Sequence, residues 1–484
     1  MNIPGYDSWL LPFVISAFDV AVSLAASAHV ILNKRDTKAA IGWIGLIWLS
    51  PLLGTGLYVL LGINRITRRA RSLRRRQARH ESPPARPCPP EVLERTLTPA
   101  KHHLLPLARL VDGVALQPLL MGNEVEPLDG GDQAYPTMVQ AIDEATRSVT
   151  LSTYIFNNDR AGTLFVDALK RAVERGVEVR VLIDGIGKRY SWPSVFGPLE
   201  RAGVPVAVFL PTFTPVWFPY FNLRNHRKIL VADGLVGFTG GMNILEDYFL
   251  EVGPRDPKRD LHFRIRGPVV SHMQRVFADD WVFCTDEYLR GERWFPAIDE
   301  VGEVLARGVS DGPDDDRDNL LNVILGALSC AESSVVLVTP YFLPDSRLVS
   351  ALELAVLRGV RVDILLPREN NHKLVQWAAT GELGNVLGGG CHVWSSPPPF
   401  DHTKLMIVDL AWTFLGSANL DPRSLRLNFE LNIECYGPEL AARLDRWFRD
   451  RLEDAVLVTA VSIEGRSLPV KLRDGAARLL SPYL

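Results

Sequence analysis

The sequence predicts an α/β protein with two similar halves that follow an apolar N-terminal region. Its 484 residues are enough for two domains of about 150–200 residues, with further segments besides. A strand–helix–strand pattern occurs twice, and a short polar motif follows each occurrence. Before them, the N-terminal region contains two long apolar stretches. These three observations set the fold class.

The two apolar stretches predict a transmembrane hairpin over residues 1–64, with spans at about 10–32 and 41–62. A helix needs about 20 mainly apolar residues to cross a bilayer. The first stretch contains one acidic residue, Asp19, and the second contains no charged residue. A cleaved signal peptide is the alternative. However, no Lys or Arg precedes Lys34, so the basic start of such a peptide is missing.

A basic run follows the second span, and it predicts the orientation of the hairpin. The run consists of Arg65, Arg68, Arg69, Arg71, Arg74, Arg75, Arg76 and Arg79. The positive-inside rule places such a run in the cytoplasm, together with the remainder of the chain. Its position beside a membrane favours contact with anionic headgroups. Residues 65–110, with the Pro-rich segment Glu81–Pro90, are therefore expected to form a basic and Pro-rich linker.

The repeat predicts two halves at residues 111–300 and 301–484. In each half an apolar β-rich run precedes a helical pattern, and the runs read VTLSTYIF and SVVLVTPYFL. The helical patterns end at Gly176 and Gly359, since glycine is a common stop signal just past a helix. A Val-rich strand follows each time. Buried strands that alternate with helices predict a largely parallel sheet with helices on both faces.

Each half then contains the pattern His-x-Lys-x4-Asp, followed by Gly-(Gly/Ser)-x-Asn. The first copy consists of His226, Lys228, Asp233 and Asn243. The second copy consists of His402, Lys404, Asp409 and Asn419. A single His-x-Lys-x4-Asp triplet arises by chance in roughly a few per cent of chains of this size. Two copies at the same place in a repeat therefore indicate a shared function.

The spacing of the motif predicts where its side chains point. His and Lys are two residues apart on a strand-like run, so they face the same side. If the halves pack about a pseudo-twofold axis, two His, two Lys and two Asn converge. Such a site would neutralise the oxygens of a phosphodiester. One imidazole could attack phosphorus, and the other could transfer protons.

Two kinds of carboxylate accompany the motif. Asp233 and Asp409 lie at strand ends, where a catalytic role and a structural role in a turn are both open. An imidazole nucleophile also needs a carboxylate to fix its tautomer. Glu430 follows the second motif on the next expected strand, and Asp260 follows the first. Ordinary salt bridging is the alternative for both.

The cysteines and the ligand spacing exclude several classes of site. Five cysteines are scattered along the chain and form no Cys-x-x-Cys pair. They predict neither a disulfide framework nor a zinc site, and they suit a reducing compartment. No other metal-ligand spacing is present, so we expect no metal and no cofactor.

These residues resemble the phospholipase D superfamily and, within it, the bacterial-type cardiolipin synthases. The resemblance covers nearly the whole chain. Its segments are Tyr154-Ile155-Phe156, Arg224 to Lys228, Phe238 to Ile244, Gly416 to Ser424, Asn428-Phe429-Glu430 and Ala477 to Pro482. It implies two tandem phospholipase D-like α/β/α sandwich halves that form one pseudo-twofold active site. The transmembrane hairpin precedes them in the chain.

The resemblance also implies an activity. One phosphatidylglycerol would donate its phosphatidyl group to another through a phosphohistidine, and glycerol would leave. By this analogy His226 is the nucleophile, His402 is the general acid and base, and Asn243 and Asn419 bind phosphate; pseudo-symmetry also permits the reverse roles for the histidines. The expected partners are phosphatidylglycerol and anionic membrane lipids, and nucleic acid is not expected.

The resemblance implies a multi-pass protein of the cell inner membrane, with its catalytic part facing the cytoplasm. Three alternatives stay open: a phospholipase D-type hydrolase, a transferase that uses another acceptor alcohol, and an inert membrane scaffold. The aromatic segment Phe213–Phe221 lies just before the first motif. It predicts either a contact with acyl chains or the membrane interface, or ordinary core packing.

Overall fold

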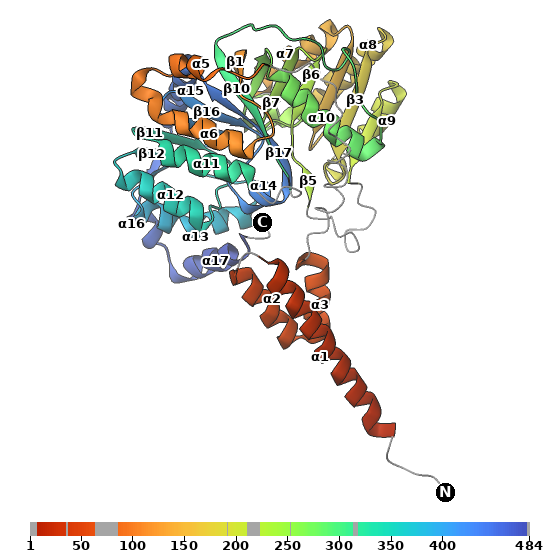
Figure 1. The fold of residues 1–484 in the computed structure, drawn as a ribbon, viewed down its shortest axis with the longest axis vertical. Coiled ribbons are helices and arrows are strands. Elements are labelled where there is room, and N and C mark those ends of the chain that lie inside the picture. Colours follow the sequence, from red (N-terminus) through yellow and green to blue (C-terminus); the bar gives the residue numbers. More distant parts are fainter. Residues whose placement is uncertain are drawn as a thin grey trace. The chain divides into compact units, whose positions relative to one another are not determined.

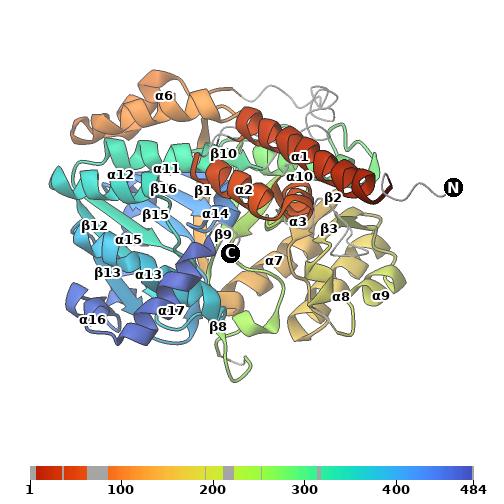
Figure 2. The ribbon, with the colours of Figure 1, turned by 90° about the horizontal axis from the view of Figure 1, so that it is seen from below.

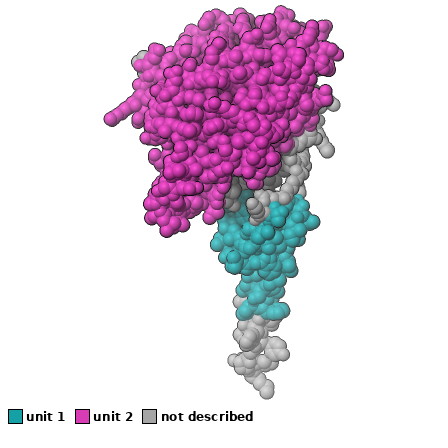
Figure 3. All heavy atoms as spheres, turned by 90° about the vertical axis from the view of Figure 1, so that its left-hand side faces the viewer, with its two compact units in different colours: residues 1–71, 214–222 teal, residues 72–213, 223–484 magenta. Residues whose placement is uncertain are grey.

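The computed structural model describes residues 7–34, 37–62, 86–190, 192–210, 223–251, 253–312 and 318–481 (Figure 1). The chain divides into two compact units (Figure 3), which are Met1–Arg71 with Thr214–Asn222, and Ser72–Phe213 with Leu223–Leu484. Three predicted features lie outside the described residues: the basic run at 65–79, the beginning of the Pro-rich segment at 81–85, and the aromatic segment at 213–221.

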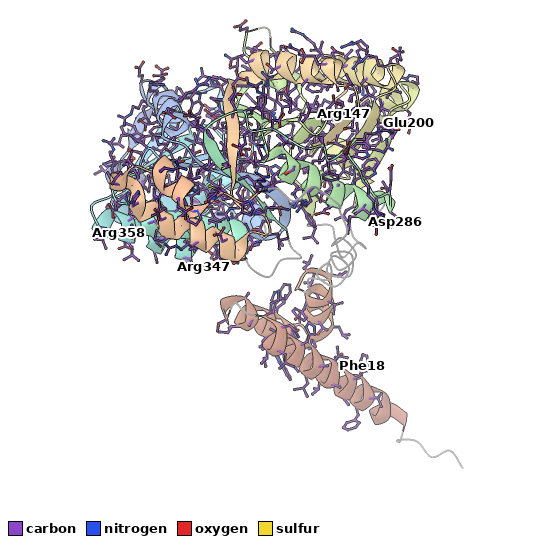
Figure 4. The ribbon with its side chains drawn as sticks, turned by 45° about the horizontal axis from the view of Figure 1, so that its top comes forward. Phe18, Arg147, Glu200, Asp286, Arg347 and Arg358 are labelled. Atoms are coloured by element: carbon purple, nitrogen blue, oxygen red, sulfur yellow. The ribbon has the colours of Figure 1, made fainter. Side chains whose placement is uncertain are left out.

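The first unit contains the apolar N-terminal helices. They are α1 (Asp7–Asn33), α2 (Thr37–Leu49), α3 (Pro51–Leu57) and the π-helical turn η1 (Tyr58–Gly62). Among the described residues one helix, over Pro12–Asn33, is long and apolar enough to cross a membrane. Phe18 projects outward from it (Figure 4), as do other large apolar side chains of α1. The first predicted span is therefore a single apolar helix of sufficient length.

The second predicted span is broken, so residues 41–62 do not form the expected continuous helix. The break lies at Ser50 and Pro51, between α2 and α3. Proline has no backbone N–H and its ring clashes with the preceding turn, so it favours the start of a new helix. Gly54 lets α3 lie against α2, because a Cβ at this position would clash with the carbonyl of Leu46.

Polar contacts connect the helices of this unit. His29 Nδ1 and the Tyr58 hydroxyl are hydrogen-bonded at 2.7 Å, and this bond joins α1 to η1. The indole N–H of Trp48 donates to Ser27 Oγ at 3.2 Å and joins α2 to α1. The three helices thus form one small cluster rather than an open hairpin.

The second unit is built on one mixed sheet of sixteen strands. Its first half contains β1 (Leu120–Asp129), β2 (Ser148–Thr153), β3 (Glu178–Asp184), β4 (Val206–Phe209), β6 (Ile229–Ala232), β7 (Val236–Gly240) and β9 (Leu261–Arg266). Its second half contains β10 (Val304–Asp311), β11 (Ser334–Val338), β12 (Arg361–Pro367), β13 (His392–Ser396), β15 (Leu405–Val408), β16 (Trp412–Gly416), β17 (Asn428–Tyr436) and β18 (Val456–Val458).

Both halves have the same strand order, counted outward from the antiparallel pair of β1 and β10. The first half runs β1-β9-β7-β6-β2-β3-β4, and the second runs β10-β17-β16-β15-β11-β12-β13 before β18. Each motif strand therefore occupies the same place in its half, with β6 matching β15. The repeat in the sequence is a repeat of topology.

The prediction of a largely parallel sheet is wrong. Only the outer strands, β2-β3-β4 and β11-β12-β13, are parallel within the main order of each half. The inner strands pair antiparallel, including the motif hairpins β6–β7 and β15–β16. Three-residue turns, at 233–235 and 409–411, close these hairpins, and a connection this short joins only antiparallel strands. The strand–helix–strand pattern found in the sequence thus corresponds only to the outer strands of each half.

Helices cover both faces of this sheet. The first half carries α7 (Gly130–Glu144), α8 (Arg160–Glu174), α9 (Phe196–Arg201) and α10 (Val270–Thr285). The second half carries α11 (Asn319–Cys330), α12 (Ser346–Leu357), α13 (Lys373–Gly388), α15 (Pro438–Leu452), α16 (Ala460–Glu464) and α17 (Leu468–Leu479). One core cluster draws on strands of both halves together with α10 and α15, so the halves share a hydrophobic core.

Part of the predicted linker 65–110 is folded into the second half. It forms α5 (Pro90–Thr96) and the beginning of α6 (Leu105–Val114). Leu107 of α6 is fully buried in the core of the second half. Arg307 of β10, also fully buried, donates to the carbonyl of Ala108 at 3.2 Å. The second half therefore includes residues of the predicted linker, from the end of the Pro-rich segment onward.

Candidate active site

Each motif begins on a short strand that pairs with the other half. β5 (Arg224–Asn225) lies parallel to β17 of the second half, and the His226 N–H donates to the carbonyl of Phe429 at 2.9 Å. Likewise β14 (Phe400–Asp401) pairs with β8 (Lys258–Arg259) of the first half, and the His402 N–H donates to the carbonyl of Arg259 at 2.8 Å. Backbone hydrogen bonds thus fix both histidines across the junction.

The imidazoles meet their carboxylates in the same crossed way. His226 Nδ1 lies 3.0 and 3.2 Å from the two oxygens of Glu430, which belongs to the second half. His402 Nδ1 lies 2.9 Å from Asp260 Oδ2, which belongs to the first half. Both carboxylates are fully buried. A complete histidine–carboxylate pair therefore needs residues from both halves.

The two carboxylates differ in the number of their donors. Glu430 also accepts from Ser417 Oγ at 2.5 Å and from Asn428 Nδ2 at 3.2 Å. Asp260 Oδ1, in contrast, has no hydrogen-bond partner among the described residues. Gly241 is the counterpart of Ser417, and a Cβ there would clash with the Asp260 carboxylate. The two pairs therefore differ chemically although their backbones match.

These contacts set the proton affinities of the four groups. Burial lowers the pKa of His226 to about 4, against the opposing charge of Glu430. Burial also lowers the pKa of His402 well below its usual value, and the nearby lysines lower it further. Burial raises the pKa of Asp260 well above that of an ordinary carboxyl. Burial would raise the pKa of Glu430 too, but His226, Lys228 and Ser417 outweigh it, so this pKa is lowered.

The two lysines converge on the same place. Lys228 Nζ donates to the carbonyl of His226 at 2.6 Å, and Lys404 Nζ donates to the carbonyl of His402. Burial lowers the pKa of Lys228 to about 7 and that of Lys404 to about 8. Each positive charge lowers the pKa of the imidazole in the other motif. The motifs thus form one electrostatically coupled cluster that would favour a bound anion.

The asparagines of the motif are buried near their own halves. Asn243 Oδ1 accepts from the N–H of Ile155 at 3.1 Å, which directs its amide group. Asn419 Nδ2 donates to Ser424 Oγ at 3.2 Å, on the short helix α14 (Pro422–Arg426). Its Oδ1 is buried without a hydrogen-bond partner in the described part of the chain. The two amides therefore have different surroundings.

Aromatic rings line both histidines, and sequence reasoning did not include them among the site residues. The ring of Tyr154 lies edge-to-face with His226, at 5.4 Å between centroids. Tyr341 has the same relation to His402 at 6.0 Å, and the Tyr248 hydroxyl lies 3.3 Å from His402 Nδ1. The signal for the first two was available, since Tyr154 and Tyr341 occupy equivalent places in the repeat.

Asp233 and Asp409 are bound to backbone at the far ends of the motif strands. Asp233 accepts from the N–H groups of Thr146, Arg147 and Ser148 at 2.7–3.2 Å. Asp409 accepts from three successive N–H groups, of residues 332–334, at 2.7–2.8 Å. Both aspartates have positive φ, as their hairpin turns require. Of the two roles left open, these contacts favour the structural one.

Metal coordination has no obvious ligand set here. Among the residues that the structure describes, no group of three or more His, Cys, Asp or Glu side chains is arranged to hold a metal ion. The nearest candidates, Glu430 and Asp260, each bind one histidine instead. The two histidines and the two lysines offer a nucleophile, a proton donor and positive charge.

The chain is similar to a protein family and to curated proteins along most of its length. Residues 138–281 and 324–452 match the family described as "Cardiolipin synthase, PLD-like domain". The chain is 31% identical to a cardiolipin synthase of Oceanobacillus iheyensis, over 96% of this chain and 98% of that one. It is 29% identical to a cardiolipin synthase of Listeria innocua, over 98% of this chain and 100% of that one.

A solved structure shows the same fold. Phosphatidylserine synthase from Haemophilus influenzae superposes with a TM-score of 0.60 at 16% identity, over 78% of this chain and 100% of that one. The fold and the paired His-x-Lys motifs define a phospholipase D-type protein with two such domains. The chain belongs to the cardiolipin synthase family within that superfamily, as the sequence predicted.

A first prediction separates the two roles of Asp233. Replacing Asp233 by Ala removes the charged acceptor of the N–H groups of Thr146, Arg147 and Ser148, so the free energy of unfolding should fall by about 1–3 kcal/mol. The kcat of the folded fraction should stay close to that of the unchanged protein. Urea unfolding and a lipid assay of the purified chain measure the two effects. Asp143→Ala, which removes an exposed partner of Arg171, is the control and should change neither. A loss of kcat at unchanged stability would restore the catalytic role.

Proposed function

We propose that the chain is a membrane-bound phosphatidyltransferase that makes cardiolipin. One phosphatidylglycerol gives its phosphatidyl group to a second one, and glycerol leaves. A single observation carries the chemistry: two imidazoles, each hydrogen-bonded through Nδ1 to a buried carboxylate of the other half. Relatives with cardiolipin synthase as their name match almost the full length of this chain, which supports the substrate.

In the first step His226 is the nucleophile. An Nδ1–H that donates to an ionised Glu430 leaves the Nε2 lone pair free. Nε2 attacks the phosphorus of phosphatidylglycerol, and the bond between phosphorus and the headgroup oxygen breaks. His402 gives its Nε2 proton to that oxygen while the proton of Asp260 moves to His402 Nδ1, so neutral glycerol departs and His402 stays neutral. The product on the protein is a phosphatidyl group bound to His226.

The difference between the two carboxylates supports this choice of nucleophile. Three side chains donate to Glu430, and they stabilise its anion. Asp260 has fewer donors, and burial raises its pKa, which favours the neutral acid over the anion. A protonated Asp260 donates to His402 Nδ1, which puts the remaining imidazole proton on Nε2. Each histidine then starts in the tautomer that its step requires.

In the second step His402 acts as the base. Its Nε2 takes the proton from a headgroup hydroxyl of the second phosphatidylglycerol while its Nδ1 proton returns to Asp260, and the hydroxyl oxygen attacks the phosphorus. The bond between phosphorus and His226 Nε2 breaks, and cardiolipin is released with both imidazoles in their initial state. Lys228 and Lys404 neutralise the phosphate oxygens in both steps. The amides of Asn243 and Asn419 bind the same group.

The architecture of the whole chain follows from the same proposal. The halves at residues 111–300 and 301–484 are related by an approximate twofold axis through the site, which their common strand order supports. Helix α1 spans the cell inner membrane, and the apolar residues of 41–62 enter it as a second, broken span. The basic residues after Asn64 place the catalytic part on the cytoplasmic side.

The product distribution tests the reaction. Purified protein in vesicles of phosphatidylglycerol should produce cardiolipin and free glycerol in equal amounts, and His226→Ala should abolish both. Phosphatidic acid as the main product would show a hydrolase. Cardiolipin that forms only when phosphatidylethanolamine is added would show another acceptor. Lipid levels unaffected by the double change His226→Ala and His402→Ala would show an inert scaffold.

Mapping of the covalent intermediate tests which histidine is the nucleophile. The protein is mixed with phosphatidylglycerol, quenched in alkaline denaturant and digested, and mass spectrometry locates the phosphatidyl adduct. We expect the adduct on His226, because Glu430 is the better anion. His226→Asn should carry no adduct. An adduct on His402 would reverse the two roles.

The lowered lysine pKa values predict a characteristic pH profile. Lysine is charged below its pKa, so kcat/KM should fall as pH rises through about 7 to 8 and the lysines lose their protons. At the acid end it should fall near pH 4, where His226 becomes protonated. Bound phosphate stabilises the ammonium ions, so the alkaline limb of kcat should lie at higher pH than that of kcat/KM. Coincident limbs would contradict this role of the lysines.

A further inference from the structure

Helix α17 presents a row of exposed leucines on the surface of the second unit. Leu468, Leu472 and Leu479 are 69%, 64% and 75% exposed. Their spacings of four and seven residues place all three on one side of the helix. Soluble proteins rarely leave such a row uncovered, since buried apolar surface is more favourable. The row therefore needs a partner that covers it.

The opposite side of α17 is firmly packed, so the exposed row is not a frayed end. Asp474 and Ala477 are buried, and the helix lies along α13 (Figure 2). Arg466 and Arg473 both pair with the Asp474 carboxylate. Arg473 also lies over the ring of Trp377 of α13, at 4.5 Å from its centroid. The fold holds α17 in one orientation, with its leucines outward.

Basic residues border the leucine row on both sides. At 100° per residue, Lys471 and Arg478 lie on one flank, where Arg478 also pairs with Glu382 at 3.7 Å, and Arg473, the partner of Asp474, lies on the other. A narrow apolar face between basic flanks is typical of helices that lie in the interface of an anionic membrane. The preceding helix, α16, also exposes an apolar side chain, Val461. Charge and apolar surface thus fit the same partner.

We propose that α17 lies flat in the surface of an anionic bilayer, with its leucine row among the acyl chains and its basic flanks at the headgroups. This contact is additional to the N-terminal span and does not depend on the proposed reaction. A second copy of the chain is a poorer fit. A single row of three leucines is far smaller than the about 800 Å² that each partner of a stable interface buries, and the basic flanks would repel each other.

Photo-crosslinking tests the contact without any turnover. The full-length protein carries benzoylphenylalanine at position 472 and is reconstituted in vesicles of phosphatidylglycerol and phosphatidylethanolamine. Irradiation should join this position to lipid. The control position is 164, an exposed leucine on α8, which should give no lipid adduct. A crosslink from 472 to protein, no crosslink, or equal lipid adducts at both positions would overturn the proposal.

An activity ratio gives a second, independent test. The triple variant Leu468→Gln, Leu472→Gln and Leu479→Gln should turn over phosphatidylglycerol in vesicles about tenfold more slowly. Its activity on short-chain phosphatidylglycerol, dissolved as monomers, should be unchanged, and Leu164→Gln should affect neither substrate. Equal losses on both substrates would contradict a membrane role. If the unchanged protein acts on neither, the proposed function fails, and the crosslinking result still decides this inference.

Discussion

The exchange of short strands between the halves is the interaction on which the site depends. β5 pairs with β17, and β14 pairs with β8. These pairings bring each histidine to a carboxylate that its own half does not supply. Arg227 strengthens the junction, because it donates to the carbonyls of Glu430 and Asp311 and pairs with Asp280. Removal of either histidine would leave a buried carboxylate without its partner, which is strongly unfavourable.

A small difference breaks the symmetry of this junction. Where the first half has Gly241, the second has Ser417, whose hydroxyl donates to Glu430. No equivalent donor reaches Asp260 from that position. This hydroxyl adds to the effects of His226 and Lys228, which together lower the pKa of Glu430, whereas burial raises the pKa of Asp260. Two halves with the same strand order can thereby hold their histidines in different tautomers, as the proposed reaction requires.

Burial makes this difference matter. In water the lysines and carboxylates of the cluster would keep their ordinary charges, and the hydrogen bonds of Glu430 would change little. In the protein Lys228, Lys404, Asp260 and Glu430 are almost fully buried, so each missing partner shifts a proton affinity strongly. The same condition would favour a bound anion at the cluster. On the outer surface, by contrast, α17 combines charge with exposed leucines, which suits a lipid interface.

The sequence by itself determined the repeat, the two motifs and the family, because period, spacing and residue type are local properties. His226, Lys228, His402 and Lys404 could all be named from it, and so could Glu430 and Asp260. The tertiary structure decided which carboxylate serves which histidine, since strand exchange between distant segments leaves no local pattern. It also decided that the inner strands are antiparallel, that Pro51 breaks the second apolar span, and that Asp233 and Asp409 bind backbone. The break at Pro51 is local, whereas the strand exchange and the partners of both aspartates depend on packing between segments far apart in the chain, which no local spacing records.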